Sequence, residues 1–324
     1  MALDAVASPL VALALVAALG VLIGAAKFFT GAAEHVGIAF GLSPFTVGVF
    51  IVALGTSLPE LVSSVLAVHR GTSEVVSGNV IGANTANLLF ILGVVAAASR
   101  RGIRLGEQYI AIDLNFMVGS AMVLALVMFD GSVGRVEASL LFAGYIAYVG
   151  YLMTEGRSVG ADAHFTSALE SPPKAGVRSR DIIILLAAGV GIFLSADVTL
   201  DALMVIAARI GISPAIASLT ILSLGTTLPE LAVSVTAARA GRAEMAVGNI
   251  LGSCIFNSFG VLGIAAMFGR VEVPVELVRL PLPAYIGSAI LFYLLTQDRR
   301  VSRWEGVLFV LLYLLLLAEL AGLA

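Results

Sequence analysis

Charged residues are scarce in this chain of 324 residues, because Asp, Glu, Lys and Arg together make up only 12% of it. A soluble domain carries roughly 25% charged residues, whereas 60% of this sequence is apolar and its mean hydropathy is +1.06. These values exclude an ordinary soluble protein and indicate a membrane protein with several spans. The net charge is only −3, and no basic tract of the kind that binds nucleic acid occurs. We therefore expect the lipid bilayer as its surroundings and no nucleic-acid partner.

Catalytic and metal-binding motifs are also missing. The one cysteine, Cys254, excludes an intrachain disulfide, and the three histidines have no metal-ligand spacing. A His-Glu-x-x-His metalloprotease motif does not occur, and no convincing pair of facing aspartates suggests an intramembrane aspartyl protease. We expect a protein that is not an enzyme and holds no cofactor, and no obligate protein partner is evident.

Long apolar runs fill most of the chain. A helix that crosses the hydrocarbon core needs roughly 20 apolar residues. No basic residue precedes Lys27, whereas a cleaved signal peptide needs a positive start, so the first apolar run is expected to remain as a helix. The fold class is therefore predicted to be an all-α integral membrane protein with ten transmembrane helices. The expected spans are 8–30, 38–68, 73–98, 108–129, 135–154, 181–208, 213–238, 243–268, 278–296 and 304–323.

Two phrases of the sequence occur twice, each time at an offset of 170 residues. Residues 55–61 read GTSLPEL and residues 225–231 read GTTLPEL. Residues 78–87 read GNVIGANTAN and residues 248–257 read GNILGSCIFN. A constant register over about 50 residues indicates two copies of one structural unit.

The duplication divides the chain into a first repeat at 1–155, a polar linker at 156–180 and a second repeat at 181–324. Five spans is an odd number, so the second copy is predicted to enter the membrane upside down relative to the first, as inverted repeats do. Loops on the linker side carry twelve Lys and Arg residues, and loops on the opposite side carry five. The positive-inside rule then places the linker in the cytoplasm and both termini outside a cell membrane.

Each repeat contains one carboxylate deep inside an apolar span, Glu60 in the first copy and Glu230 in the second. A charged residue at a helix centre costs about 2.5–3.5 kcal/mol on insertion scales. No Lys or Arg lies nearby in either span to pair with these groups. A proton or a bound cation must therefore stabilise them.

The neighbouring residues favour a cation. Pro59 has no N–H group, so the carbonyl of Gly55 loses its helical partner and can coordinate a metal. Thr56 lies four residues before Glu60 and shares its helix face. Carboxylate, hydroxyl and carbonyl oxygens are ligands that Ca²⁺ binds, and two carboxylates match the charge of one divalent cation. The plain alternative is a kinked helix that carries a neutral glutamic acid.

The second repeated phrase combines small and polar residues. Its glycines have the small-xxx-small spacing that lets membrane helices approach closely. Its polar positions recur on one helix face as Asn79, Ala83 and Asn87 in the first copy and as Asn249, Ser253 and Asn257 in the second. We favour ion contact for Asn87 and Asn257. For Asn79 and Asn249, ion contact and bridging between helices both remain open.

In these motif pairs the chain resembles the sodium/calcium exchanger family of the calcium/cation antiporter superfamily, whose repeats carry the same GTSLPE and GN-x-x-G signatures. The resemblance implies that Glu60 and Glu230 bind Ca²⁺ at the membrane centre, and that Na⁺ sites on either side use the same glutamates. It also implies that the first and sixth helices slide across a fixed core to alternate access. The further ligands that it implies are Thr56 and Thr226 through their carbonyls, the side chains of Ser57, Thr227 and Ser253, the carbonyls of Ala53 and Ser223, and the central amides of Asn87 and Asn257.

Two positions depart from the family pattern. Ala83 stands where its repeat partner, Ser253, and many relatives have serine, which removes a hydroxyl from one of the Na⁺ sites that the resemblance implies. Asn257 stands where some relatives have aspartate, so a third central carboxylate is missing. Na⁺/Ca²⁺ antiport is the leading hypothesis. Ca²⁺/H⁺ exchange, another cation substrate and K⁺ co-transport remain alternatives, and a passive channel or a purely structural membrane protein would leave the duplicated glutamates without a counter-ion role.

Overall fold

The computed structural model describes residues 8–40, 42, 46–99, 102–105, 114–163, 178–209, 223–320 and 322, and nearly all of them are helical. The first half contains α1 (Ser8–Ala39), the π-helix η1 (Val47–Val52), α3 (Ala53–His69), α4 (Glu74–Thr85), the π-helix η2 (Ala86–Ile91), α5 (Leu92–Ala98), α6 (Leu114–Met128) and α7 (Arg135–Ala163). The second half contains α8 (Ser179–Arg209), α10 (Ser223–Thr226), α11 (Leu228–Arg239), α12 (Ala243–Ile255), the π-helix η5 (Phe256–Val261), α13 (Leu262–Phe268), α14 (Val275–Arg279), α15 (Pro281–Leu295) and α16 (Arg303–Leu320).

Many of these helices are long and apolar. Six continuous helical stretches within the described residues are long and apolar enough to cross a membrane, and α6 is a shorter apolar helix. The six stretches are Pro9–Ala39, Val47–His69, Glu74–Ala98, Ser179–Thr199, Ala243–Phe268 and Val275–Leu295. The prediction of a mostly helical, multi-pass membrane protein is confirmed.

Several helix boundaries differ from the predicted ones. Helix α1 continues to Ala39 rather than ending near residue 30, and α7 continues to Ala163, past the predicted start of the linker at 156. The ninth span is divided at Leu280 into α14 and α15, since Pro281 starts a new helix. In each case hydropathy identified the part of the helix that suits lipid, whereas the helix itself ends where its hydrogen bonds end. The helix starts expected at Ser43-Pro44 and Ser213-Pro214 lie outside the described residues.

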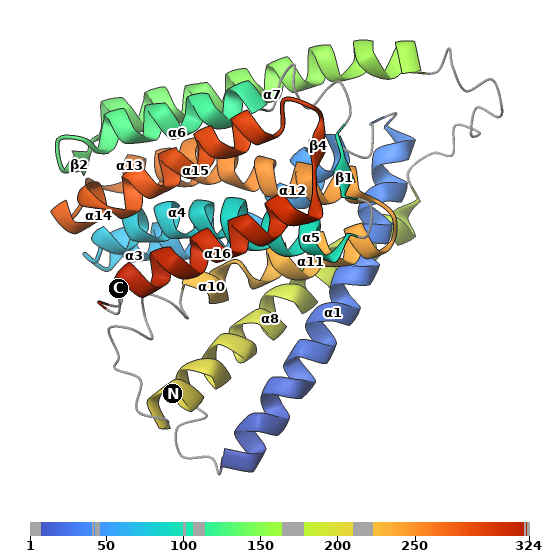
Figure 1. The fold of residues 1–324 in the computed structure, drawn as a ribbon, viewed down its shortest axis with the longest axis horizontal. Helices are drawn as coiled ribbons and strands as arrows, with labels where there is room; N and C mark the ends of the chain where they lie inside the picture. The colour runs from blue at the N-terminus through green and yellow to red at the C-terminus, as the bar shows by residue number, and fades with distance from the viewer. Residues whose placement is uncertain are drawn as a thin grey trace.

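Two short antiparallel ladders connect the halves of the chain. Strand β1 (Ile103–Arg104) pairs with β4 (Arg300–Val301), and β2 (Ser132–Val133) pairs with β3 (Val271–Glu272). Figure 1 shows β1 and β4 together at one end of the helix bundle and β2 at the opposite end. Each ladder therefore joins a loop of the first half to a loop of the second, one at each end of the bundle.

Glycines bring the core helices into backbone contact. A Cβ atom on Gly252 of α12 would collide with the carbonyl oxygen of Val49 in η1, and one on Gly48 would collide with the carbonyl oxygen of Met245. A Cβ on Gly306 of α16 would lie 2.7 Å from the carbonyl oxygen of Gly93 in α5. Such close approaches are available only to glycine. Among the glycines of the small-xxx-small motifs, Gly252 makes one, whereas a Cβ atom on Gly78 would make only ordinary contact with Leu277 at 3.8 Å.

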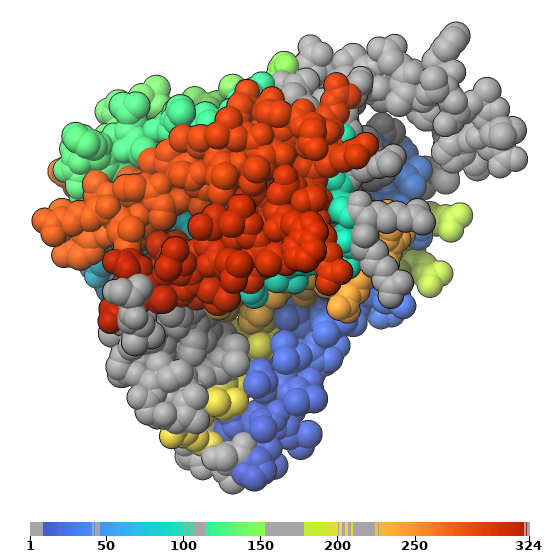
Figure 2. Space-filling model, in the orientation of Figure 1, coloured from blue at the N-terminus to red at the C-terminus, as the bar shows by residue number. Residues whose placement is uncertain are grey.

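Helices α1 and α8 form a pair of their own. They lie side by side and slant away from the layers that contain α4, α12 and α16 (Figure 1). In Figure 2 the orange-red helices α15 and α16 cover the face toward the viewer, while α1 projects from the lower part of the molecule. The buried core around α3, α4, α11 and α12 is thus enclosed by other helices on one side and contacts the α1–α8 pair on the other.

Candidate functional site

Glu60 and Glu230 lie inside the helical core, on α3 and α11. Their side chains are 1% and 0% exposed, and the two carboxyl groups are close enough to interact electrostatically. Neither carboxylate forms an ion pair with a Lys, Arg or His among the described residues. The core therefore holds two acidic groups of like charge without a protein cation to neutralise them.

Helix geometry around the two glutamates differs between the copies. Pro59 lies inside the continuous helix α3, directly before Glu60. In the second copy the helix is interrupted at Thr227, and α11 starts afresh with Pro229 in its first turn and Glu230 next to it. A proline is well tolerated in a first turn, where its missing N–H group has no helical partner in any case. The same Leu-Pro-Glu sequence thus accompanies a continuous helix in one copy and a broken helix in the other.

Ser57 connects the two repeats at the site. Its hydroxyl donates a hydrogen bond to Oε1 of Glu230 at 2.8 Å and lies 2.9 Å from the hydroxyl of Ser253 on α12. All three side chains are buried. We call Ser57, Ser253 and Glu230 the Glu230 cluster. It brings two hydroxyl groups from different repeats to one carboxylate.

Thr56 makes a second connection between the repeats. Its hydroxyl lies 3.2 Å from the side-chain oxygen of Asn249, and the amide nitrogen of Asn249 donates to the hydroxyl of Ser234 at 2.9 Å. Asn249 is fully buried in these contacts. The structure thus assigns Asn249 to bridging between α3, α11 and α12, which the sequence alone left open.

Several buried polar atoms have no hydrogen-bond partner among the described residues. Among them are both carboxylate oxygens of Glu60, Oε2 of Glu230 and the amide oxygen and nitrogen of both Asn87 and Asn257. Burying a polar group without a partner costs several kcal/mol in apolar surroundings, and burying an unpaired charge costs more. Oxygen atoms predominate in this set, and oxygens are what Ca²⁺ and Na⁺ bind. The unsatisfied atoms therefore fit a cation as their missing partner.

Asn87 and Asn257 each occupy the second position of a π-helical segment, in η2 and η5. The two segments start at Ala86 and Phe256, which are 170 residues apart and so have the same offset as the sequence motifs. Short π-helical turns within α-helices occur often at functional sites. Both asparagine side chains are buried.

The other residues that the sequence indicated are placed in part. Ala53 is buried at the start of α3, and Thr227 is buried in the turn between α10 and α11, where its hydroxyl donates to the carbonyl of Leu224 at 3.1 Å. Ser223 and Thr226 belong to α10, but their side chains lie outside the described ones. Among the residues described, no group of three or more His, Cys, Asp or Glu side chains is placed to hold a metal ion, so a cation here would rely on two carboxylates and on neutral oxygens.

Sequence reasoning missed part of this polar core. Ser64 has a buried hydroxyl without a partner, and Asn84 donates from its amide to Ser258 at 2.9 Å and to the carbonyl of Cys254 at 3.3 Å. Asn84 and Cys254 are equivalent positions of the two repeats, 170 residues apart. Equivalent positions of the two sequence repeats are therefore in contact, and the repeat offset was the signal that could have singled out this pair.

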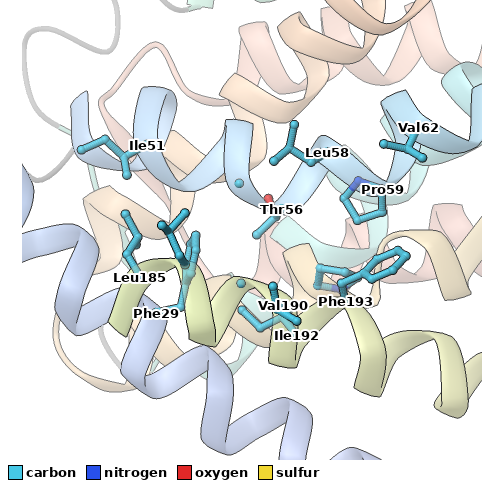
Figure 3. Close-up of a pocket in the computed structure, with 14 residues that line it drawn as sticks. Phe29, Ile51, Thr56, Leu58, Pro59, Val62, Leu185, Val190, Ile192 and Phe193 are labelled. Carbon is cyan, nitrogen blue, oxygen red and sulfur yellow. The ribbon is translucent and has the colours of Figure 1, made fainter. Parts of the chain in front are cut away.

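An apolar cavity of about 400 Å³ lies beside the site. Figure 3 shows Phe29 of α1, Val190 and Phe193 of α8 and Thr56 and Pro59 of α3 around it. Thr56 is the one hydroxyl-bearing residue among those that line it, and Pro229 of the second repeat borders it as well. The cavity is therefore lined both by the α1–α8 pair and by residues of the two motifs.

A mostly helical, multi-pass membrane protein with a duplicated polar motif around two buried carboxylates belongs, by fold and site, to the class of secondary ion transporters. Comparison with known families gives the specific assignment. The profile of the family named sodium/calcium exchanger protein matches residues 10–154 and 181–320. The chain belongs to this family, which consists of transporters rather than enzymes.

Individual relatives are similar to this protein over most of its length. The sodium/calcium exchanger MaX1 of Methanosarcina acetivorans is 29% identical over 334 residues, covering 92% of this chain and 95% of that protein. The inner membrane protein YrbG of Escherichia coli is 29% identical over 271 residues, with 83% of each chain covered. A solved structure of the sodium-calcium exchanger NCX_Mj, soaked with 2.5 mM Na⁺ and 1 mM Sr²⁺, superposes with a TM-score of 0.80 at 24% identity, covering 95% of this chain and 98% of that one. The fold is thus that of a prokaryotic-type exchanger.

Proposed function

We propose that this protein exchanges Na⁺ for Ca²⁺ across the cell membrane by alternating access, and that both ions compete for one site built on Glu60 and Glu230. The observation that supports it most is the set of buried, unpartnered oxygens on Glu60, Glu230, Asn87 and Asn257. These four residues come from both repeats and are all buried, and no Lys, Arg or His among the described residues forms an ion pair with either glutamate. Membership in the sodium/calcium exchanger family names the ions.

Competition for the carboxylates would couple the two ion flows. One Ca²⁺ ion neutralises both glutamates, whereas Na⁺ ions neutralise them one at a time. Because charges in a core of low dielectric constant interact strongly, Ca²⁺ and a full set of Na⁺ ions cannot share the site. Each crossing of the membrane then carries one ion type or the other, which is what exchange requires. The carbonyls of Ala53, Ser223, Thr56 and Thr226 and the hydroxyls of Ser57, Thr227 and Ser253 would complete the ion shells.

The proposal includes ten transmembrane helices arranged as two inverted repeats of five. If the repeats had the same orientation, the equivalent strands β1 and β3 would lie at the same end of the bundle. Instead β1 pairs with β4 at one end and β3 pairs with β2, which lies at the other (Figure 1). That exchange of partners supports the inverted arrangement. The orientation, with the 156–180 linker cytoplasmic and both termini outside, follows from the distribution of Lys and Arg.

We further infer that α1 and α8 move together against the remaining helices. The apolar cavity of about 400 Å³ supports this, because it leaves space between that pair and α3. Phe29 of α1 reaches across to the motif helix, since a Cβ atom on Gly55 would lie 2.6 Å from its ring. The lining of the cavity is almost wholly apolar, so movement along it would break few hydrogen bonds, although the ion pair between Glu34 of α1 and Arg242 before α12 would have to follow or open.

Filling the cavity is therefore expected to slow exchange. In Gly189→Leu the new Cβ makes ordinary contact with Phe29 at 3.5 Å, and the rest of the leucine side chain enters the cavity. Overpacking costs typically 1–3 kcal/mol, and if this cost falls on the moving step the exchange rate falls about tenfold or more. The measurement is the initial rate of Ca²⁺ uptake by proteoliposomes, together with equilibrium Ca²⁺ binding, which should stay within about twofold of wild type.

Gly24→Leu is the matched control for this variant. Gly24 lies on α1, and nothing stands within 4 Å of a Cβ atom placed there. The same substitution at this open position should leave the exchange rate unchanged. Equal rates in Gly189→Leu and wild type would contradict the movement of the α1–α8 pair along this cavity.

The function itself is tested by reconstitution. Liposomes loaded with Na⁺ and diluted into Na⁺-free buffer should take up ⁴⁵Ca²⁺, and uptake should stop when internal Na⁺ is replaced by choline. A proton gradient imposed without Na⁺ serves as the control. Uptake driven by the proton gradient alone would instead support Ca²⁺/H⁺ exchange, which the missing hydroxyl at Ala83 and the missing carboxylate at Asn257 keep as the second candidate.

A further inference from the structure

The proposed site has two halves, one built around Glu230 and one around Glu60, and they carry different numbers of hydroxyl groups. Around Glu230 lie the hydroxyls of Ser57 and Ser253, at hydrogen-bonding distance from each other and, for Ser57, from the carboxylate. The residues equivalent to Ser57 and Ser253 lie at the repeat offset of 170 and are Thr227 and Ala83, which we assign by this equivalence to the Glu60 half. Alanine supplies no oxygen, so the Glu60 half has one hydroxyl where the Glu230 half has two.

The hydrogen bonds show the same imbalance. Oε1 of Glu230 accepts a bond from Ser57, whereas both carboxylate oxygens of Glu60 lack a partner among the described residues. The hydroxyl of Thr227, the equivalent of Ser57, donates to the carbonyl of Leu224, and the hydroxyl of Ser64, four residues after Glu60 on α3, has no partner among the described residues. Glu60 is thus the less satisfied of two equally buried carboxylates.

Part of this difference would change as a transporter moves between states, but the part due to Ala83 would not. Hydrogen bonds such as that of Thr227 can form and break in different conformations. A methyl side chain offers no ligand in any conformation. Ala83 is fully buried on α4, four residues after Asn79, so bulk water does not reach this position directly in the structure.

We propose that the two halves bind Na⁺ with unequal affinity, the Glu230 half strongly and the Glu60 half weakly, and that Ala83 sets the difference. The inference rests on the proposed Na⁺/Ca²⁺ exchange and adds the specificity of each half to it. A hydrogen bond or ligand contact to a charged group is worth enough to change affinity about tenfold or more. Ca²⁺ binding is affected less, because its attraction comes mainly from the two carboxylates, and both are present.

The consequence is a two-step response to Na⁺. The Glu230 half fills at low Na⁺ concentration, and the Glu60 half fills only at a concentration about tenfold higher or more. Ca²⁺ remains attracted to Glu60 until that second step is complete. Ala83 would therefore set the Na⁺ concentration at which the protein releases Ca²⁺.

The test compares four forms of the full-length protein that differ only at the two equivalent positions. They are the wild type, Ala83→Ser, Ser253→Ala, and the double variant that combines both substitutions. For each, displacement of bound ⁴⁵Ca²⁺ by Na⁺ is measured on purified protein by scintillation proximity, and Na⁺-driven ⁴⁵Ca²⁺ uptake is measured in liposomes. Thermal stability is recorded alongside, so that a folding defect is recognised.

Wild type is expected to show two Na⁺ midpoints. Ala83→Ser should lower the upper midpoint about tenfold, so that the two merge, and Ser253→Ala should raise the lower midpoint by a similar factor. The double variant has the same composition as wild type and exchanges the roles of the halves, so its curve should again show two midpoints. If Ala83→Ser does not fold, the Ser253→Ala and double variants still decide the matter.

The same measurements distinguish a failure of this inference from a failure of the proposed function. Na⁺-driven Ca²⁺ uptake with one Na⁺ midpoint in wild type, unmoved by Ala83→Ser, would overturn the inequality of the halves and leave the exchange intact. Absence of Na⁺-driven uptake in all four forms, with folded protein, would overturn the exchange and the inference together.

Discussion

Replacing either buried glutamate with glutamine is expected to abolish Ca²⁺ exchange. Glu60→Gln and Glu230→Gln keep the size and shape of the side chain but remove one of the two charges that hold a divalent cation. The effect should be at least a hundredfold loss of Na⁺-driven ⁴⁵Ca²⁺ uptake, because removing one charged partner of a buried ion pair costs about 3–5 kcal/mol and each 1.4 kcal/mol is about tenfold. The measurement is initial uptake by proteoliposomes at matched protein content.

Folding should survive these two substitutions. Neither carboxylate has an ion-pair partner among the described residues, so glutamine leaves no opposite charge stranded. Removing a buried unpaired charge is more often neutral or stabilising than harmful. We expect the thermal stability of both variants, measured without Ca²⁺, to equal or exceed that of wild type.

Glu74→Gln is the matched control. Glu74 lies in the first turn of α4 and is exposed, so the same chemical change there should leave the uptake rate unaltered. Ca²⁺ uptake near the wild-type rate in Glu60→Gln or in Glu230→Gln would remove that residue from the site. Equal loss in all three variants would point to a general effect of charge rather than to a cation site.

The second large effect concerns stability. Gly306→Val is expected to prevent correct packing of α16 on α5, because a Cβ atom at this position would lie 2.6 Å from the backbone nitrogen of Ala97 and 2.7 Å from the carbonyl oxygen of Gly93. Both contacts involve backbone atoms, which cannot turn aside as a flexible side chain can. Overpacking of this kind costs about 3 kcal/mol or more. After heating, the variant should lose most of its monodisperse peak in size-exclusion chromatography at temperatures that wild type tolerates.

Gly287→Val tests whether the loss comes from the contact rather than from valine in a membrane helix. Gly287 is exposed on α15, and nothing lies within 4 Å of a Cβ atom built there. This variant should keep the stability of wild type to within about 1 kcal/mol, the range of helix propensities. If Gly306→Val were as stable as Gly287→Val, the close crossing of α5 and α16 would not be needed for the fold.

The sequence predicted the polar core well for a physical reason. In an apolar run, a carboxylate or amide has few tolerable positions, and two copies in register remove most of the ambiguity. Glu60, Glu230, Asn87 and Asn257 were identified in this way, and the structure buries all four. Their role as ion ligands remains a prediction until the variants above are measured.

Other features could not be predicted from the chain. Hydropathy reports which residues suit lipid, so it missed the continuation of α7 to Ala163. The π-helical turns at Asn87 and Asn257 use residues that fit an α-helix equally well, and only the tertiary packing selects between the two. The hydrogen bond from Ser57 to Glu230 joins residues 173 positions apart, and a contact over this distance cannot be predicted from the local sequence pattern.

The two β-ladders have a consequence for how the protein is made. Strands β1 and β2 belong to the first half, yet their partners β4 and β3 are synthesised only as residues 271–301 leave the ribosome. Until then the first half lacks the edge partners of both strands. The contact of Ser57 with Glu230 becomes possible earlier, because residue 230 is synthesised before residue 271. Closure of the ladders thus comes later than synthesis of the site residues, and a nascent chain interrupted before residue 300 would reach the membrane without the ladder that joins β1 to β4.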